Sequence, residues 1–168
     1  MNNLVYKKTL GKCIDISFYQ IYLTIIPLIH KLHQLRWRNI ILLVNKAKSN
    51  FKVAEYAEKN RHYDAAVSRY YYYLYEYFLN FLGITKPELV TGNHSLDLNN
   101  ATDYIKENLC KNRNEKYIIT RMKFLKSQRI ESDYYDIRIE NSTEFANRFK
   151  TRFDKINELL IDKGVINV

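Results

Sequence analysis

Residues that interrupt helices are rare in this chain. Its 168 residues include only 4 glycines and 2 prolines, whereas β-sandwiches and β-barrels need many turn residues. Hydrophobic residues make up 46% and charged residues 27%, which is typical of a folded core and argues against disorder. At this length the chain is the size of one ordinary domain. The sequence therefore predicts long helices in an all-α fold.

Apolar residues recur at spacings of three and four in five stretches, which is the pattern of amphipathic helices. A short polar break at Lys59-Asn60-Arg61 separates the first two stretches, so we expect them to form an antiparallel hairpin. The expected helices cover residues 37–58, 62–82, 95–109, 114–132 and 142–162. Together they predict a four- to five-helix up-down bundle over residues 37–168, preceded by a basic and apolar helical extension over residues 1–36.

Two of these helices have apolar faces rich in aromatic side chains. The last one presents Phe145, Phe149, Phe153, Ile156 and Leu160 to the predicted core. The second carries consecutive tyrosines at positions 70–73, which cover every side of a helix. Because one inner face cannot hide so many large aromatics, we expect part of this helix to form the interface of a two-fold homodimer.

Basic residues outnumber acidic ones by 27 to 18, which gives a formal net charge of +9. This surplus favours an anionic partner, most simply nucleic acid. The surplus is concentrated in residues 1–52, with nine basic side chains and one acid, and in residues 106–129, with eight and two. We expect the second tract to contact RNA or a nucleotide, with Arg121, Lys123 and Lys126 among the contacts.

The cysteines and histidines form no recognisable metal site. Cys13 and Cys110 are far apart, and the four histidines do not combine with them at zinc-ligand spacing. We therefore expect ordinary thiols in a cytoplasmic protein, with no metal and no cofactor. The uncharged stretch from Ile16 to His30 is shorter than the roughly 20 residues of a membrane-spanning helix, so no membrane partner is expected.

The pair Arg129 and Asp133 is the most unusual charged feature. The sequence has no Gly-x-Ser-x-Gly elbow, phosphate-binding glycine loop or His-Glu-x-x-His motif. The inner stripe of the fourth predicted helix instead continues from Leu125 to Arg129, with Asp133 one turn later. A charge on an apolar face needs a partner. The pair is therefore either a structural clamp or an arginine held rigid for binding a phosphate group.

Three further side chains are candidates for the same chemistry. His94 lies in the loop before the third predicted helix, where it is either a capping residue or a proton-transfer group, since the pKa of histidine lies near neutrality. Arg69 lies near the apolar face of the second helix, and an accessible tyrosine close to it, such as Tyr72, offers a ring for base stacking. The alternative for these tyrosines is an aromatic core.

The run from Tyr63 to Tyr72 resembles the Tyr-Asp-x-Ala-x-Ser-Arg-x-Tyr-Tyr signature of the HEPN superfamily (higher eukaryotes and prokaryotes nucleotide-binding). It is most similar to the small prokaryotic members encoded beside nucleotidyltransferase antitoxins. Those members share a His after the second helix, matched by His94. They also share an Arg-x-x-x-Asp-Tyr element in the fourth helix, matched by Arg129, Asp133 and Tyr134. The three motifs occur in the same order, and the resemblance covers about residues 38–163.

The resemblance implies a bundle that dimerises about its motif helices and, in many members, a metal-independent endoribonuclease. In those members an Arg and a His, separated by four to six intervening residues, form the active site of each protomer. This chain has Tyr134, Tyr135 and Asp136 at those distances from Arg129, so it is similar to the branch with the Arg-x-x-x-Asp-Tyr element. His94 is then the available proton-transfer group.

Two hypotheses of function follow. In the first, the chain is a toxin or phage-defence protein that binds RNA across a dimer cleft and cleaves it. Arg129 would hold phosphate and be oriented by Asp133. Tyr134 would contact phosphate or base, and His94 would transfer a proton. In the second, the chain is a non-catalytic module that binds RNA or a nucleotide, or that holds a nucleotidyltransferase-type partner.

Overall fold

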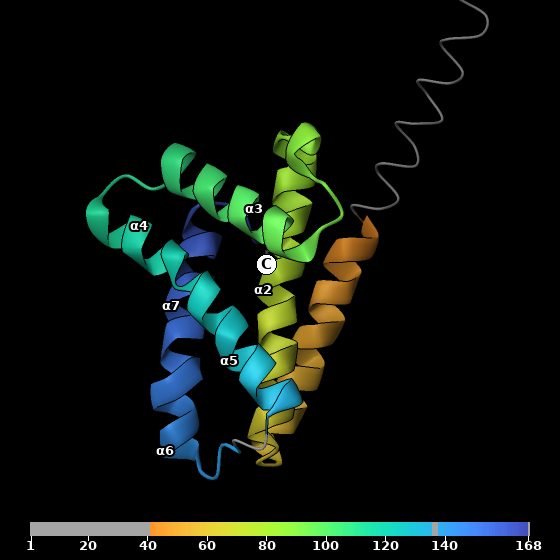
Figure 1. The fold of residues 1–168 in the computed structure, drawn as a ribbon, viewed down its shortest axis with the longest axis vertical. Coiled ribbons are helices and arrows are strands. Elements are labelled where there is room, and N and C mark those ends of the chain that lie inside the picture. Colours follow the sequence, from red (N-terminus) through yellow and green to blue (C-terminus); the bar gives the residue numbers. More distant parts are fainter. Residues whose placement is uncertain (1–40, 136–137, 168) are drawn as a thin grey trace, which may run out of the picture. The chain divides into compact units, whose positions relative to one another are not determined.

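The computed structural model describes residues 41–135 and 138–167 of the chain (Figure 1). Within these residues all regular structure is helical and no strand occurs, so the predicted all-α bundle is confirmed. No described helix is both long and apolar enough to cross a membrane. The chain divides after Asn39, and every described residue belongs to the second unit, Ile40–Val168. The predicted extension over residues 1–36 lies outside the described residues.

The first described helix, residues 41–59, and α2, Tyr63–Thr85, lie side by side as the predicted antiparallel hairpin (Figure 1). Lys46 Nζ lies 2.6 Å from the carboxylate of Glu76, so the start of one helix meets the later part of the other. Between this contact and the turn, Phe51 packs against two tyrosine rings of α2. The apolar face predicted for the first helix therefore packs on α2.

The predicted end of α2 at Gly83 is wrong. α2 continues through Gly83 to Thr85 because this glycine does not adopt a positive φ and stays helical. Pro87 explains where the helix stops, since the residue before a proline is disfavoured in the α conformation. Lys86 accordingly has φ −143° and ψ 64°.

Three helices follow a short 3₁₀ turn and replace two predicted ones. The turn is η1, Pro87–Leu89, and the helices are α3, His94–Asn108, α4, Arg113–Thr120, and α5, Met122–Tyr134. The single helix predicted over residues 114–132 is therefore wrong. It divides at Arg121, whose backbone N–H bonds to the carbonyl of Ile118 only three residues back. No glycine or proline marks this break, and the buried Ile119, Met122 and Leu125 keep one stripe across it.

The last predicted helix is continuous but contains a π-helical segment. It consists of α6, Ser142–Phe145, η2, Ala146–Lys150, and α7, Thr151–Asp162. Asn141 caps its start by accepting a 2.9 Å hydrogen bond from the N–H of Glu144. Phe145, Phe149 and Phe153 are buried and stack in series with ring centroids 6.2 Å apart. The apolar face predicted for this helix is thus confirmed as core.

α2 is the central helix and is buried on nearly every side, because the first described helix, α3, α5 and α7 all pack against it. Its buried tyrosines are Tyr63, Tyr70, Tyr71, Tyr73, Tyr75 and Tyr77. The expectation that α2 has surplus aromatics for a dimer interface is therefore wrong, since neighbouring helices of the same chain cover them. Tyr72 is the exception and is half-buried.

Candidate functional site

Arg129 lies near the C-terminal end of α5 with only 17% of its side chain exposed. Its Nε lies 2.8 Å from Oδ2 of Asp133, one turn further along the helix. This contact is an ion pair rather than a hydrogen bond, because the buried Nε lacks a partner in hydrogen-bond geometry. Nη2 donates a 2.5 Å hydrogen bond to the hydroxyl of Tyr72 on α2. Arg129 is thus held by its own helix and by the central helix.

Aromatic rings lie against the Arg129 guanidinium. Its Cζ is 4.9 Å from the ring centroid of Tyr72 and 5.4 Å from that of Tyr134, distances at which a ring attracts a cation. Ser68 on α2 donates a 3.3 Å hydrogen bond to Oδ2 of Asp133. The ion pair is therefore tied to α2 at two points, whereas Tyr134 is 71% exposed and presents its ring to solvent.

His94 is the first residue of α3, and the loop before it is fixed by hydrogen bonds. Buried Asp97 accepts bonds of 2.7 Å from the N–H and the hydroxyl of Thr91 and a bond of 3.1 Å from the N–H of Gly92. Gly92 has φ 79°, a conformation that L side chains rarely adopt. Asn93 then caps α3 with its side chain. These contacts fix the loop at the start of α3, where His94 lies.

The His94 ring packs into the tyrosines of α2. It stacks on Tyr75 with centroids 4.1 Å apart, and its Nε2 lies 3.2 Å from the hydroxyl of Tyr71. Burial raises the pKa of Tyr71, so the phenol stays protonated and can donate to Nε2, which favours the tautomer with the proton on Nδ1. The Tyr72 ring lies 6.4 Å from the His94 ring, edge to face. Tyr72 thus neighbours both His94 and Arg129.

The pKa of His94 is lowered from its ordinary value. Burial is the main cause, and the positive charges of Lys126 and Arg129 act in the same direction, whereas Asp97 opposes them. Lys126 on α5 reaches the start of α3, where its Nζ donates a 2.5 Å hydrogen bond to the hydroxyl of Ser95. A histidine with a lowered pKa is neutral at pH 7 and can accept a proton.

These side chains are called the Arg129 cluster. Its members are Ser68, Tyr71, Tyr72, Tyr75, His94, Lys126, Arg129, Asp133 and Tyr134. They come from α2, α3 and α5. The cluster combines two cations suited to a phosphate group, an imidazole suited to accepting a proton and an exposed ring suited to stacking on a base.

The structure brings together all four residues predicted as catalytic, namely Arg129, Asp133, Tyr134 and His94. It also places in the cluster two of the five predicted nucleic-acid contacts, Tyr72 and Lys126. The stretch between His94 and Arg129 is long, so sequence order alone did not show that the two residues lie close together. Their assignment as functional residues stays a prediction.

The other three predicted nucleic-acid contacts have their own surroundings. Arg69 donates a 3.4 Å hydrogen bond to Asn50 on the first described helix. Arg121 lies over the ring of Tyr117, with Cζ 4.3 Å from its centroid. Lys123 is exposed and has no ion pair with another described residue. Among the described residues, no hydrogen bond or ion pair joins any of the three to the Arg129 cluster.

We did not predict from the sequence that Tyr71 and Tyr75 belong to the Arg129 cluster. We also did not predict that one face of α2 carries four members of the cluster. Ser68, Tyr71, Tyr72 and Tyr75 stand at positions i, i+3, i+4 and i+7, so they share one helical face. This spacing was a readable signal. The neighbouring tyrosines at other positions obscured it, because all faces of α2 carry similar residues.

Among residues 41–135 and 138–167, no three His, Cys, Asp or Glu side chains form a group that could hold a metal ion. Cys110 is a buried free thiol, and burial raises its pKa.

Comparison with protein-family models gives no match, and no curated protein or solved structure is significantly similar to the chain. The HEPN resemblance therefore rests on the three sequence motifs and stays a prediction.

Proposed function

We propose that the Arg129 cluster binds RNA and cleaves it without a metal ion, as a ribonuclease toxin of the HEPN superfamily would. One observation supports this most. Arg129 and His94, which are distant in the sequence, both lie against Tyr72 on α2, and Lys126 reaches the start of α3, where His94 lies. A proton acceptor beside two phosphate-binding cations is the minimum that self-cleavage of an RNA strand requires.

The cleavage step assigns one task to each group. His94 takes the proton of the 2′-hydroxyl, the 2′-oxygen bonds to phosphorus, and the bond from phosphorus to the 5′-oxygen breaks. The leaving oxygen takes a proton from water. Arg129 and Lys126 stabilise the negative charge that develops on the phosphate oxygens. Neutral His94 is suited to its task because its pKa is lowered.

Arg129 retains donors for a phosphate group. Nη2 bonds to Tyr72 and Nε pairs with Asp133, so both contacts involve one side of the guanidinium. Nη1 has no hydrogen bond to another described residue. The exposed ring of Tyr134 lies against the Arg129 guanidinium and can stack on the base next to the bound phosphate. Asp133 acts here as a positioning residue.

A non-catalytic role is the second candidate, and the position of His94 favours it. Nε2 is already in contact with the Tyr71 hydroxyl at 3.2 Å, so a 2′-hydroxyl must displace this contact before its proton can be taken. In that case the cluster binds RNA or a nucleotide without cleaving it, or holds a nucleotidyltransferase-type partner. Both candidates place the ligand at Arg129.

Cleavage of end-labelled RNA by the purified full chain in EDTA distinguishes the two candidates. The first predicts discrete products from the wild type and a loss of about 100-fold or more in rate for His94→Gln, with RNA still bound. The matched control is His62→Gln, since His62 is exposed and its side chain makes no capping hydrogen bond at the start of α2. Binding without products supports the second candidate. Absence of RNA binding contradicts the first candidate and the RNA-binding form of the second.

A homodimer and a nucleotidyltransferase-type antitoxin in the cytoplasm belong to the same proposal. Exposed apolar side chains occur on the first described helix, at Ile41, Leu42, Val53 and Tyr56, and these suit an interface between chains. Light scattering at tens of micromolar should give twice the monomer mass. A monomer mass at that concentration would contradict the dimer without bearing on RNA binding.

A further inference from the structure

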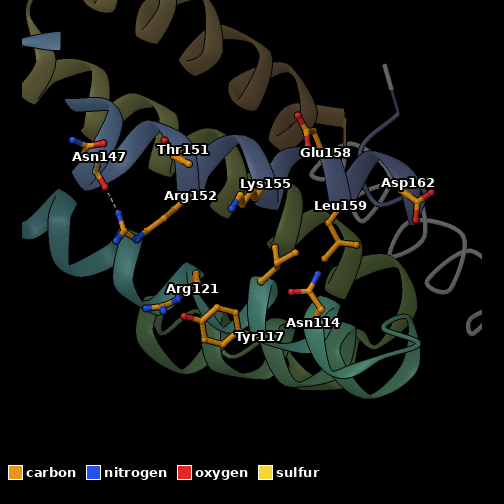
Figure 2. A pocket seen from close by; sticks show the side chains of 11 residues that line it. Asn114, Tyr117, Arg121, Asn147, Thr151, Arg152, Lys155, Glu158, Leu159 and Asp162 are labelled. Carbon is orange, nitrogen blue, oxygen red and sulfur yellow. Dashed lines mark hydrogen bonds between the residues drawn. The ribbon is translucent and has the colours of Figure 1, made fainter. Parts of the chain in front are cut away.

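A second site of interest is a cavity of about 650 Å³ between α4 and α7 (Figure 2). Ile118 and Leu159 contribute apolar surface to it, and its polar lining includes Arg121, Arg152 and Lys155. Figure 2 shows the two guanidinium groups near the same end of the pocket, with Lys155 next along α7. The volume lies within the range of small-molecule sites, about 300–1,000 Å³.

The three cations of this cavity lack carboxylate partners. Among the described residues, none of Arg121, Arg152 and Lys155 has an acidic side chain within ion-pair distance. The neighbouring Arg148 shows the contrast, since it pairs with two glutamates at 2.9 and 3.0 Å. Cations that converge without a carboxylate create a positive potential available to an anionic ligand.

Arg152 is held in place by the π-helical segment. Its Nη1 donates to the carbonyl oxygens of Asn147 and Arg148, the second at 3.0 Å, and its Cζ lies 4.7 Å from the ring centroid of Phe124. The Asn147 contact is drawn in Figure 2. Both hydrogen bonds use Nη1, and neither Nη2 nor Nε has a hydrogen bond to another described residue. Arg121 is held differently, by the ring of Tyr117. Two guanidinium groups fixed before binding favour a tightly held anion.

The opposite end of the cavity is acidic. Glu158 and Asp162 lie further along α7, and Figure 2 shows them away from the guanidinium groups. Asp162 pairs with Lys163 at 3.0 Å, so Glu158 is the carboxylate that a ligand with negative charge along its whole length would meet unfavourably. The charge pattern therefore suits a molecule with a single anionic end better than it suits an RNA strand.

We infer that this cavity binds a small organic phosphate, with its phosphate group between Arg121, Arg152 and Lys155. The organic part lies on Ile118 and Leu159 and extends towards Glu158. Planar guanidinium groups match the oxygens of a phosphomonoester, and the ammonium of Lys155 adds charge without fixed geometry. This site shares no residue with the Arg129 cluster, so it goes beyond the proposed ribonuclease function.

Calorimetric titration of the purified full chain with phenyl phosphate tests the inference, with inorganic phosphate and phenol as comparison ligands at constant ionic strength. We expect phenyl phosphate to bind more tightly than either comparison ligand. Arg121→Gln and Arg152→Gln should each weaken binding about tenfold. Lys48→Gln is the matched control because Lys48 is exposed on another helix, and it should leave binding unchanged.

Glu158→Gln is a second test that does not depend on the arginines, since Glu158 is exposed and its loss should not disturb the fold. Removing this charge should strengthen phenyl phosphate binding about twofold. No binding by the wild type at millimolar ligand overturns the inference, as does inorganic phosphate binding equally well. Displacement of phenyl phosphate by an RNA oligonucleotide whose own affinity falls in Arg152→Gln overturns it too, because the cavity would then belong to an RNA surface.

Discussion

The hydroxyl of Tyr72 accepts a 2.5 Å hydrogen bond from Nη2 of Arg129, and its ring centroid lies 4.9 Å from Cζ of the same guanidinium. One side chain of α2 thus holds Arg129 through both its polar and its aromatic part. Asp133 pairs with another nitrogen of the group. The orientation of Arg129 is therefore set before any ligand binds, which reduces the entropy lost on binding.

Tyr72→Phe removes the hydroxyl and keeps the ring. Nη2 then loses its acceptor, and we expect a loss of about 0.5–1.5 kcal/mol in the free energy of unfolding. RNA cleavage should fall about tenfold, because the guanidinium is less well oriented. Urea unfolding and a cleavage assay measure the two effects. Tyr104→Phe is the control, since Tyr104 is also half-buried but lies outside the cluster, and a loss of activity there as large as for Tyr72→Phe would contradict the assigned role.

Arg129→Ala separates a structural clamp from a ligand-binding arginine. Side chains of Arg129 and Asp133 are 17% and 25% exposed, and Asp133 keeps its hydrogen bond from Ser68. The loss of stability should therefore be about 1–3 kcal/mol, less than for a fully buried pair. Thermal unfolding measures it. A chain that no longer folds would assign the pair to structure alone.

Arg129→Lys keeps the positive charge and removes the planar guanidinium group. If the guanidinium binds a phosphate oxygen while it contacts Tyr72 and Asp133, a lysine cannot reproduce this geometry. RNA affinity should fall in this variant although the protein melts near the wild-type temperature. Wild-type affinity in a filter-binding assay would show that only the charge matters.

The stability of the protein should depend on pH through His94. Because its pKa in the folded chain lies below the unfolded value, the unfolded chain binds more protons between the two values. The free energy of unfolding therefore rises with pH across this window. The contribution of neutral His94 to stability is lost as the pH falls below about 6.5. Melting temperatures at about pH 7.5 and pH 5.5 should differ more for the wild type than for His94→Gln. Equal differences would mean that the histidine titrates normally.

The hairpin contact between Lys46 and Glu76 should matter more for stability than its surface position suggests. The Glu76 side chain is only 2% exposed, and Lys46 Nζ lies 2.6 Å from it. Lys46→Met leaves this carboxylate buried without its cation and should cost about 3 kcal/mol of unfolding free energy in urea. Lys48→Met, on the exposed side of the same helix, should stay within about 0.5 kcal/mol of the wild type. Equal effects would contradict the role of the contact.

Periodicity predicted the helices and much of the core. The spacing of Phe145, Phe149 and Phe153 indicated the inner face of the last helix, and all three side chains are buried. The break at Arg121 was not predictable in this way, because it contains no helix-breaking residue and the apolar stripe continues across it. Periodicity reports which face is apolar, and it is insensitive to one tightened turn.

The contacts of the candidate sites that the sequence did not predict were missed for a different reason. The pair Arg129 and Asp133 was predictable because its contacts lie within one helix. The approach of His94 to this pair depends on how α3 packs on α2, which no local pattern specifies. The cavity near Arg152 was missed for the same reason, since its cations come from helices that become neighbours only in the folded chain.

Analysis of cellular RNA after induction of the full chain tests the central claim most directly. The wild type, Arg129→Ala and the matched Arg148→Ala should be compared at equal protein levels, since Arg148 also pairs with a glutamate one turn away but lies outside the cluster. We predict fragmented RNA with the wild type and with Arg148→Ala, and intact RNA with Arg129→Ala. RNA fragmentation by a folded Arg129→Ala protein equal to that by the wild type would contradict the assignment of the site.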